Sequence, residues 1–188
     1  MEHFSVLPPT FFQRSAITVA QQLLGKQLVR QYRDHSLTSL PIREVEAYDG
    51  VSDLANHAAK GKRTPRNEIM FALGGYFYLY WCYGIHLMLN VVCDETEYPA
   101  AVLIRGAGQI NGPGKLTKFL QLEKSLNGKP VLPQQGLWFA DTGFEIHPAE
   151  IKTTPRIGIS QKAGEWRDQP LRFLWQPKTA SENWGTEF

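Results

Sequence analysis

Hydrophobic residues recur at intervals of three and four between Phe11 and Leu24, after the turn-forming residues 7–10. This spacing predicts an amphipathic helix over residues 11–24, which Gly25 ends. Ser52 can cap a second, shorter helix, which is expected over residues 52–59. Residues 67–73 and 115–122 are also expected to be helical.

Most other hydrophobic residues fall in short runs bounded by glycine, proline or polar residues, a pattern typical of β-strands. The runs predict strands over residues 28–32, 42–48, 76–81, 86–92, 100–106, 137–139, 144–147 and 171–175, and an extended segment over 156–159. Only Cys82–Ile85 separates the fourth run from the third, so these two should form a β-hairpin. Strands outnumber helices and follow one another through hairpins. The sequence therefore predicts an α+β fold with a curved, mainly antiparallel β-sheet flanked by helices. The polar tail after Gln176 should be loosely held.

The second predicted strand carries the first candidate functional residue, Glu46. Because alternate residues of a strand share a face, Glu44, Glu46 and Tyr48 should line one side. Val45 and Ala47 should pack into the core on the other. A carboxylate beside an aromatic ring in a partly dry groove can hold a water molecule and accept its proton. A salt-bridged carboxylate without a catalytic role would give the same pattern.

The same alternation puts Tyr76, Tyr78 and Tyr80 on one face of the predicted hairpin. Such a surface binds flat rings because stacking is worth about 1–3 kcal/mol per base, and a cationic ring gains further from the aromatic quadrupole. Tyr83 falls at the hairpin tip beside Gly84, where a large ring can be pushed between base pairs. A structural role at the core and its rim is equally compatible with these tyrosines. The opposite face of the strand is expected in the core: Phe77, Leu79 and Trp81.

Cationic residues cluster between Glu46 and the hairpin, in the loop at residues 60–66. Such a run is often only a solvated face, but it suits phosphate contacts if nucleic acid is the partner. Lys115 follows glycines that resemble part of a phosphate loop but lack the Walker spacing. The start of the following helix could still bind one phosphate. The candidate DNA-backbone contacts are Arg63, Arg66 and Lys115.

Composition adds few constraints. The 188 residues are 43% hydrophobic and 20% charged, and the formal net charge is +2, which suits one ordinary globular domain. Cys82 and Cys93 lie in apolar runs without metal-site spacing, so they are expected to be buried thiols in a reducing compartment, and no metal is expected. A signal-peptide pattern and a run of about 20 apolar residues are both missing from the sequence, so a cytoplasmic protein without membrane contact is expected.

Taken in order, several motifs resemble the alkylpurine DNA glycosylase family, the 3-methyladenine glycosylases of the type also found in mammals. They are Glu-Val-Glu-Ala-Tyr-Asp-Gly at 44–50, Asn-His at 56–57, Arg-Thr-Pro-Arg-Asn at 63–67, Met-Phe at 70–71, Tyr-Leu-Tyr-Trp-Cys-Tyr-Gly at 78–84, Asn90, Leu-Ile-Arg at 103–105, Gly-Pro-Gly-Lys-Leu at 112–116, Arg-Ile-Gly at 156–158 and Ala-Gly-Glu-Trp at 163–166. Each motif is weak alone, but the ordered set from about Arg43 to Phe173 is specific. Smaller or branched aliphatic residues are more usual in the family at Trp81-Cys82, and serine is frequent at Gly114.

The resemblance implies a monofunctional DNA glycosylase of base excision repair, formed by a single domain over residues 1–188, with the tyrosine hairpin protruding. Such an enzyme flips alkylated or deaminated purines out of DNA and hydrolyses the N-glycosidic bond with a Glu-activated water, leaving an abasic site. The implied partner is damaged double-stranded DNA, and no cofactor is implied. The protein is expected to be a monomer, associated with the nucleoid if bacterial.

The resemblance also assigns residues by position. Glu46 would activate the attacking water, and Arg105 would help to hold it. Arg105 also ends a hydrophobic strand, where a buried arginine needs a partner such as Glu46. The flipped base would lie between Tyr48, His57 and Tyr80.

Two further roles follow from the resemblance. Asn90 would crowd the amino group of guanine and so discourage normal purines. Tyr83 would fill the gap that the flipped base leaves.

The residue pattern itself leaves two other functions open. The first is a nucleic-acid-binding module that stacks bases without chemistry. The second is a carbohydrate hydrolase, which needs a second carboxylate beside Glu46. The sequence offers Glu44, Asp49 and Asp53 for that role.

Overall fold

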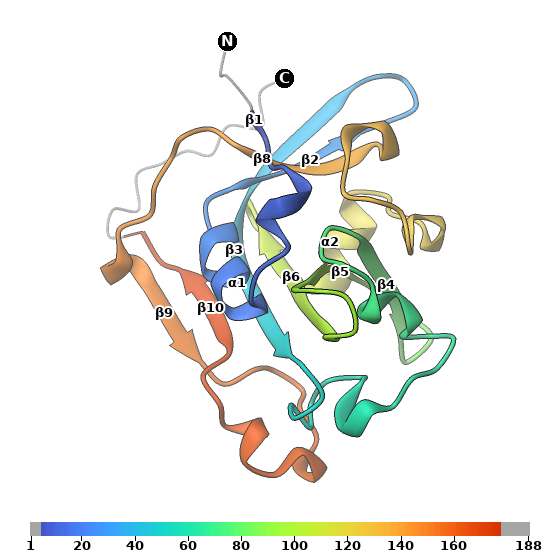
Figure 1. Ribbon diagram of the computed structural model, residues 1–188. Helices are drawn as coiled ribbons and strands as arrows, with labels where there is room; N and C mark the ends of the chain where they lie inside the picture. The colour runs from blue at the N-terminus through green and yellow to red at the C-terminus, as the bar shows by residue number, and fades with distance from the viewer. Residues whose placement is uncertain (1–4, 178–188) are drawn as a thin grey trace.

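The computed structural model describes residues 5–177, in which one antiparallel sheet dominates (Figure 1). The strands follow the order β1-β8-β2-β3-β6-β5-β4, with β10 and β9 continuing from β3 and β7 pairing with β6. Their bounds are β1 Ser5–Val6, β2 Gln27–Gln31, β3 Leu37–Asp49, β4 Phe77–Cys82, β5 His86–Cys93, β6 Ala100–Ala107, β7 Ile110–Asn111, β8 Leu137–Asp141, β9 Ile151–Thr154 and β10 Arg172–Trp175. The predicted α+β class with a mainly antiparallel sheet is confirmed.

Within residues 5–177, two α-helices pack on this sheet, α1 (Ala16–Leu23) and α2 (Pro113–Phe119), and short 3₁₀ turns join the remaining segments. α1 covers β3, β5 and β6, where its buried face completes the main hydrophobic core. The sequence placed the start of this helix too early, because residues 9–11 form a separate 3₁₀ turn. The backbone carbonyl of Phe12 instead accepts a hydrogen bond from the Asp94 N–H.

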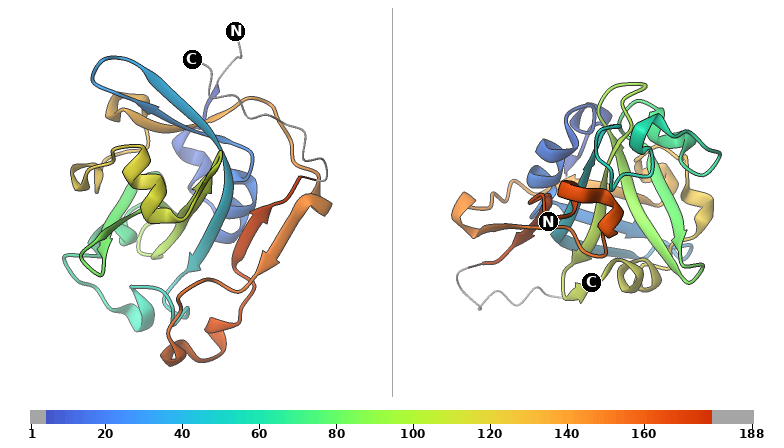
Figure 2. Two further views of the ribbon diagram at one scale, coloured as in Figure 1. Left: turned by 180° about the vertical axis from the view of Figure 1, so that it is seen from behind. Right: turned by 90° about the horizontal axis from the view of Figure 1, so that it is seen from below.

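β3 is the central strand. Its first half pairs with β2, its second half pairs with β10 on the same edge, and β6 lies along the other edge. Val45 and Ala47 are fully buried in the core, as their parity predicts, so Glu46 and Tyr48 lie on the opposite face. Two long connections, residues 50–76 and 155–171, lie at the same end of the molecule, at the bottom of Figure 1 and of the left view in Figure 2. They enclose the end of β3 that carries Glu46.

Three segments differ from their predicted secondary structure. Residues 52–59 form turns instead of a helix, because side chains bond the backbone there: Asn56 Nδ2 donates to the Gly50 and Pro99 carbonyls. Residues 144–147 alternate like a strand but form no strand in the described chain, and Phe144 packs on the Trp175 ring. Residues 156–159 are irregular. The tail after Gln176 lies almost wholly outside the described residues.

β4 and β5 pair antiparallel, and the three residues Tyr83, Gly84 and Ile85 join them. Tyr83 and Gly84 have positive φ, 51° and 70°, and the Ile85 N–H donates to the Cys82 carbonyl, so the chain reverses tightly there. Phe77 and Leu79 are in the core, but Trp81 is 48% exposed and its core assignment is wrong. The strand has passed beyond the core by this point, so parity no longer implies burial. Cys93 is a buried free thiol as expected, whereas Cys82 is only half-buried.

β4 ends the sheet, and residues 124–129 protect its open edge. Asn127 Oδ1 accepts the Leu79 N–H at 2.9 Å, Lys124 Nζ donates to the Leu79 carbonyl, and Gly128 and Lys129 bond the backbone of Phe77. These contacts satisfy groups that an unpaired edge would expose, and they hold the strand that carries Tyr78 and Tyr80. In the described residues, no helix has the length and apolar character of a membrane span.

The edge contact gives a stability prediction. Asn127→Ala should lower the free energy of unfolding by about 1–3 kcal/mol, because the Leu79 N–H loses its acceptor. Urea denaturation followed by circular dichroism measures the change. Asn127→Asp keeps an acceptor oxygen and should lose less. Equal midpoints for wild type and Asn127→Ala would contradict the proposed edge contact.

Candidate active site

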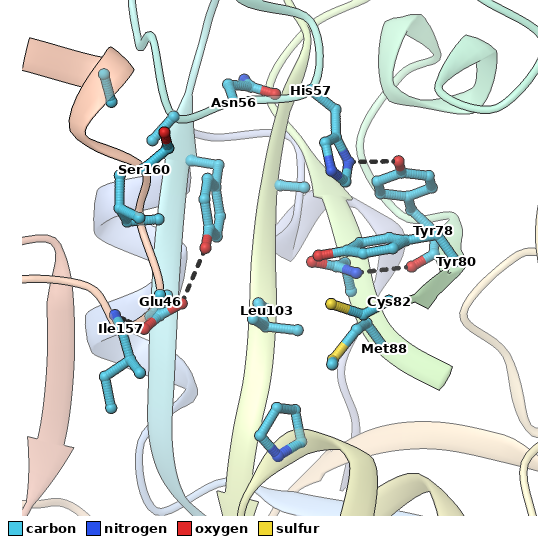
Figure 3. Close-up of a pocket in the computed structure, with 18 of the residues that line it drawn as sticks. Glu46, Asn56, His57, Tyr78, Tyr80, Cys82, Met88, Leu103, Ile157 and Ser160 are labelled. Atoms are coloured by element: carbon cyan, nitrogen blue, oxygen red, sulfur yellow. Dashed lines mark hydrogen bonds between the residues drawn. The ribbon is translucent and has the colours of Figure 1, made fainter. Parts of the chain in front are cut away.

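A cavity of about 570 Å³ opens between the Glu46 face of β3 and the aromatic face of β4. Figure 3 shows Glu46 and Ile157 on one side and His57, Tyr78 and Tyr80 on the other, with Leu103 of β6 between them. The two long connections supply the remaining walls, including Asn56 and Ser160. Segments that are far apart in the sequence therefore meet at one hollow.

Glu46 is fully buried, and three groups hold its carboxylate. Oε1 accepts the Ile157 backbone N–H at 2.7 Å and lies 3.3 Å from an Arg105 guanidinium nitrogen. Oε2 accepts only the Tyr48 hydroxyl, at 2.9 Å, among the described residues. Burial raises the pKa of Glu46, while the Arg105 charge, the Ile157 N–H and the Tyr48 hydroxyl oppose that rise. The result is an oriented carboxylate that is more basic than an exposed one, as a general base requires.

Arg105 is held by two carboxylates. Its Nε donates to Glu44 Oε1 at 2.7 Å, and the same oxygen accepts Nε of Arg172 from β10, also at 2.7 Å. The predicted pairing of Arg105 with Glu46 is confirmed, although Glu44 is the closer partner. Burial lowers the pKa of Arg105, but the Glu46 and Glu44 charges reverse this and raise it. Arg105 is thus a fixed positive charge beside the catalytic candidate.

A buried ion pair supports Tyr48. The Arg156 guanidinium lies 4.6 Å from the centre of the Tyr48 ring and bonds both carboxylate oxygens of Asp53. Arg156 also donates to the Ala47 carbonyl at 2.9 Å. Burial and the adjacent Glu46 charge raise the pKa of Tyr48 well above its ordinary value, so the phenol keeps its proton and donates to Glu46. Since Ile157 follows Arg156 directly, the ion pair also places the N–H that holds Glu46.

The opposite wall is aromatic. His57 Nδ1 lies 2.8 Å from the Tyr78 hydroxyl, and the His57 ring meets the Tyr80 ring edge-on at 4.6 Å (Figure 3). Desolvation against these rings, with the nearby Arg66 charge, lowers the pKa of His57 to about 4. His57 is therefore uncharged at neutral pH and does not repel a cationic ring. Tyr76, the third member of the predicted tyrosine face, does not line the cavity.

Asn90 of β5 is buried in the cavity lining, and its Nδ2 donates to the Tyr78 carbonyl at 3.0 Å. That bond fixes the side chain, so Asn90 is a rigid obstacle to any group that approaches it. Tyr83 lies at the rim with 90% of its surface exposed. A bulky residue at positive φ costs about 1–2 kcal/mol, and such strain is typical of functional positions.

The three candidate DNA-backbone residues have different surroundings in the structure. Arg66 lies at the cavity rim, over the Tyr80 ring at 5.0 Å. Arg63 is exposed but bonds Glu68 and Glu97, which neutralise its charge. Lys115 is exposed on α2, outside the cavity lining.

Sequence reasoning missed several groups that shape the cavity. Asp53 and Arg156 are 103 residues apart, and neither side chain signals the other in the sequence. The Ile157 contribution is a backbone N–H, which no side-chain pattern reveals. Lys162 lies at the rim and has no recognisable motif. A buried charge pair of this kind is found only when the chain is folded.

Fold and site together define a class of protein: an antiparallel α+β protein in which a buried carboxylate faces an aromatic wall across a cavity. Among the described residues, Glu46 is the one carboxylate in the lining of this cavity. The family model for methylpurine-DNA glycosylases matches residues 10–110 and 107–179 of the chain. The chain belongs to the methylpurine-DNA glycosylase family, which confirms the resemblance.

Curated relatives agree with this assignment. A protein of Borrelia garinii is 44% identical over 88% of this chain and 91% of its own length. One of Psychrobacter cryohalolentis is 40% identical over 91% and 92%, and one of Bacillus subtilis is 40% identical over 89% and 91%. All three carry the name "Putative 3-methyladenine DNA glycosylase".

The low pKa of His57 is testable. The imidazole should titrate near pH 4 in an NMR titration, with Arg66→Ala raising that value because a nearby positive charge is removed. The unfolded chain binds the proton at about 6.5. The stability that neutral His57 contributes is therefore lost as pH falls from about 6.5 to about 4. An imidazole pKa near 6.5 in the folded protein would contradict this environment.

The buried ion pair gives another prediction. Asp53→Asn should destabilise the protein by about 3–5 kcal/mol, because it leaves the Arg156 charge buried without a counter-charge. Urea denaturation measures the loss. The double variant Asp53→Leu/Arg156→Met removes both charges and should recover part of it. A loss of less than about 1 kcal/mol in the free energy of unfolding of Asp53→Asn would match an exposed ion pair. It would show that the Arg156 charge is solvated.

Proposed function

We propose that this protein is a monofunctional DNA glycosylase that flips alkylated or deaminated purines out of double-stranded DNA and hydrolyses their N-glycosidic bond with a water molecule activated by Glu46. One observation carries the proposal. A fully buried carboxylate, oriented by Ile157, Tyr48 and Arg105, lines a cavity with an aromatic wall that suits a flat ring. The names of the curated relatives support the same activity.

The cavity suits a base that has left the duplex. A glycosylase reaches its bond only when the nucleotide is extruded, which costs a few kcal/mol and costs least for damaged bases. The base would stack between Tyr48 and the His57–Tyr80 pair. A cationic N-alkylated purine gains further from the electron-rich ring faces. Because His57 is neutral, it adds no repulsion.

The chemistry is a hydrolytic displacement at the sugar. The bond between C1′ and the purine nitrogen breaks, and its electron pair leaves with the base. An alkylated purine already carries positive charge and therefore leaves as a neutral molecule. A deaminated purine is uncharged, so it leaves as an anion and takes its proton from water. Water attacks C1′, and Glu46 accepts the proton that the water loses. The Glu46 charge also stabilises the oxocarbenium character that develops on the sugar, and Arg105 helps to hold the water.

The remaining candidates fit the same picture. Asn90, fixed by its bond to Tyr78, would crowd the amino group of guanine. Tyr83 would fill the gap in the helix from the tip of a protruding hairpin. Arg66, Arg63 and Lys115 are the proposed contacts to the DNA backbone, with Arg63 the weakest because two carboxylates already bind it. The enzyme would act as a monomer on DNA in the cytoplasm.

A carbohydrate hydrolase is less well supported. It needs two carboxylates facing one cavity, whereas Glu46 is the one carboxylate in the cavity lining of the described chain. Glu44 is bound by Arg105 and Arg172, and Asp53 by Arg156. A base-stacking module without chemistry has the same aromatic wall, but it gives no reason to bury Glu46.

The deciding variant is Glu46→Gln, which keeps the shape and removes the base. Wild type should release free base from duplexes that contain 3-methyladenine or hypoxanthine, measured by chromatography. The variant should lose about 100-fold or more in rate, the range of general-base catalysis, while gel-shift affinity for the duplex stays similar. Release at the wild-type rate would exclude Glu46 as the base. No release of any alkylated or deaminated purine by wild type would contradict the proposed activity.

The same reaction can also test whether the enzyme is monofunctional, that is, whether it forms no Schiff base with DNA. Lys162 lies at the cavity rim and is the amine that could form a Schiff base. Borohydride added during turnover should trap no protein–DNA adduct. An adduct that Lys162→Ala abolishes would show a lyase activity instead.

A further inference from the structure

A second hollow lies between the tip of the β4–β5 hairpin and α2. Its volume is about 510 Å³, and it is open to the surface along one side. The hairpin contributes Trp81 and Ile85, and β5 contributes His86 and Leu87. The helix and its end form the other wall: Gly114, Thr117, Lys118, Gln121 and Leu122. We call this hollow the hairpin–helix groove.

Hydrophobic side chains are exposed around this groove to an extent that the fold does not require. Trp81 is 48% exposed, Ile85 is 71% exposed, and both neighbour the exposed Tyr83. Clustered exposed hydrophobic residues mark interaction surfaces. Neither side chain is needed by the core, and Ile85 does not line the Glu46 cavity. Ile85 is therefore exposed on a surface outside the proposed lesion pocket.

Close contacts hold α2 against β5 beside the groove. A Cβ atom at Gly114 would lie 2.9 Å from His86 Nδ1, closer than packing allows, so the glycine lets His86 lie against the helix. Thr117 is fixed by a 2.8 Å bond from its hydroxyl to the Leu87 carbonyl. These contacts set the distance between strand and helix beside the groove.

The charge of the groove favours an anionic occupant. Lys118 lines it, Lys115 lies one turn earlier on the same helix, and none of the described lining residues is acidic. An aromatic and aliphatic wall with a cationic edge is the combination that binds nucleotides, the ring by stacking and the phosphate by charge.

The groove is continuous with the proposed DNA interface. Trp81 borders both hollows, and Tyr83 in the adjacent loop lines the Glu46 cavity. Tyr78 and Tyr80 line the Glu46 cavity, whereas Ile85 and His86 line only the groove. If the damaged strand enters the Glu46 cavity, the complementary strand is left at the other side of the inserted tip.

We propose that the hairpin–helix groove binds the nucleotide of the complementary strand that loses its partner when the damaged base is flipped. Its base packs against Trp81 and Ile85, and its phosphate lies near Lys118. This inference rests on the proposed glycosylase activity and extends it, because it makes the enzyme respond to the strand that does not carry the damaged base.

Base release from duplex and single-stranded forms of one oligonucleotide tests the groove. Ile85→Ala/Lys118→Ala removes one hydrophobic and one cationic contact without touching the Glu46 cavity. At enzyme concentrations below saturation, release of hypoxanthine from the duplex should fall 10-fold or more, with the single-strand rate within two-fold of wild type. Phe119→Ala is the matched control, since Phe119 is an exposed hydrophobic residue of α2 outside the groove, and it should change neither rate.

A second readout locates the nucleotide directly. 5-Iodouracil placed opposite the lesion should crosslink under light to His86, which lines only the groove, and the site is identified by mass spectrometry. Equal losses on duplex and single strand, or crosslinks elsewhere only, would overturn the inference. Unchanged rates together with concentration-dependent self-association that Ile85→Ala abolishes would assign the groove to a second copy of the chain. Failure of wild type to release base from either substrate would instead contradict the proposed activity on which the inference rests.

Discussion

The burial of the Glu46 carboxylate is the constraint on which the site depends. An ionised carboxylate loses several kcal/mol of hydration when it is removed from water, so it persists only where other groups replace the water. Here the replacements come from three segments: Tyr48 on the same strand, Arg105 on β6, and the Ile157 N–H on a distant connection. The connection is itself anchored by the Asp53–Arg156 pair. The site and the fold therefore stabilise each other.

The two-residue period of β-strands makes this arrangement possible. β3 gives Val45 and Ala47 to the core and Glu46 to the cavity, and β4 does the same with Leu79 and Tyr80. A rigid hydrophobic layer thus lies directly beneath the functional face. Side chains on such a support keep their positions better than side chains on loops. The end of β4 extends beyond the core, so the residues near the hairpin tip can be exposed.

Local chemistry explains where sequence reading failed. Residues 52–59 have a helix-compatible composition, but Asn56 bonds backbone carbonyls from two other segments. Trp81 has the parity of a core residue, but β4 has already left the core where Trp81 occurs. In both cases a tertiary contact, or its absence, overrode a pattern that was locally sound.

The sequence by itself determined the α+β class, the hairpin with its tip tyrosine, the inward and outward faces of β3 and β4, and, through its ordered motifs, the family. These features depend on periodicity and turn chemistry, which neighbouring residues encode. Only the tertiary structure decided that Arg105 binds Glu44 more closely than Glu46, that Arg156 lies on Tyr48, that a backbone N–H orients the catalytic candidate, and that a groove opens beside Gly114. Those contacts join residues tens to more than a hundred positions apart, and their energies depend on burial, which no local pattern specifies.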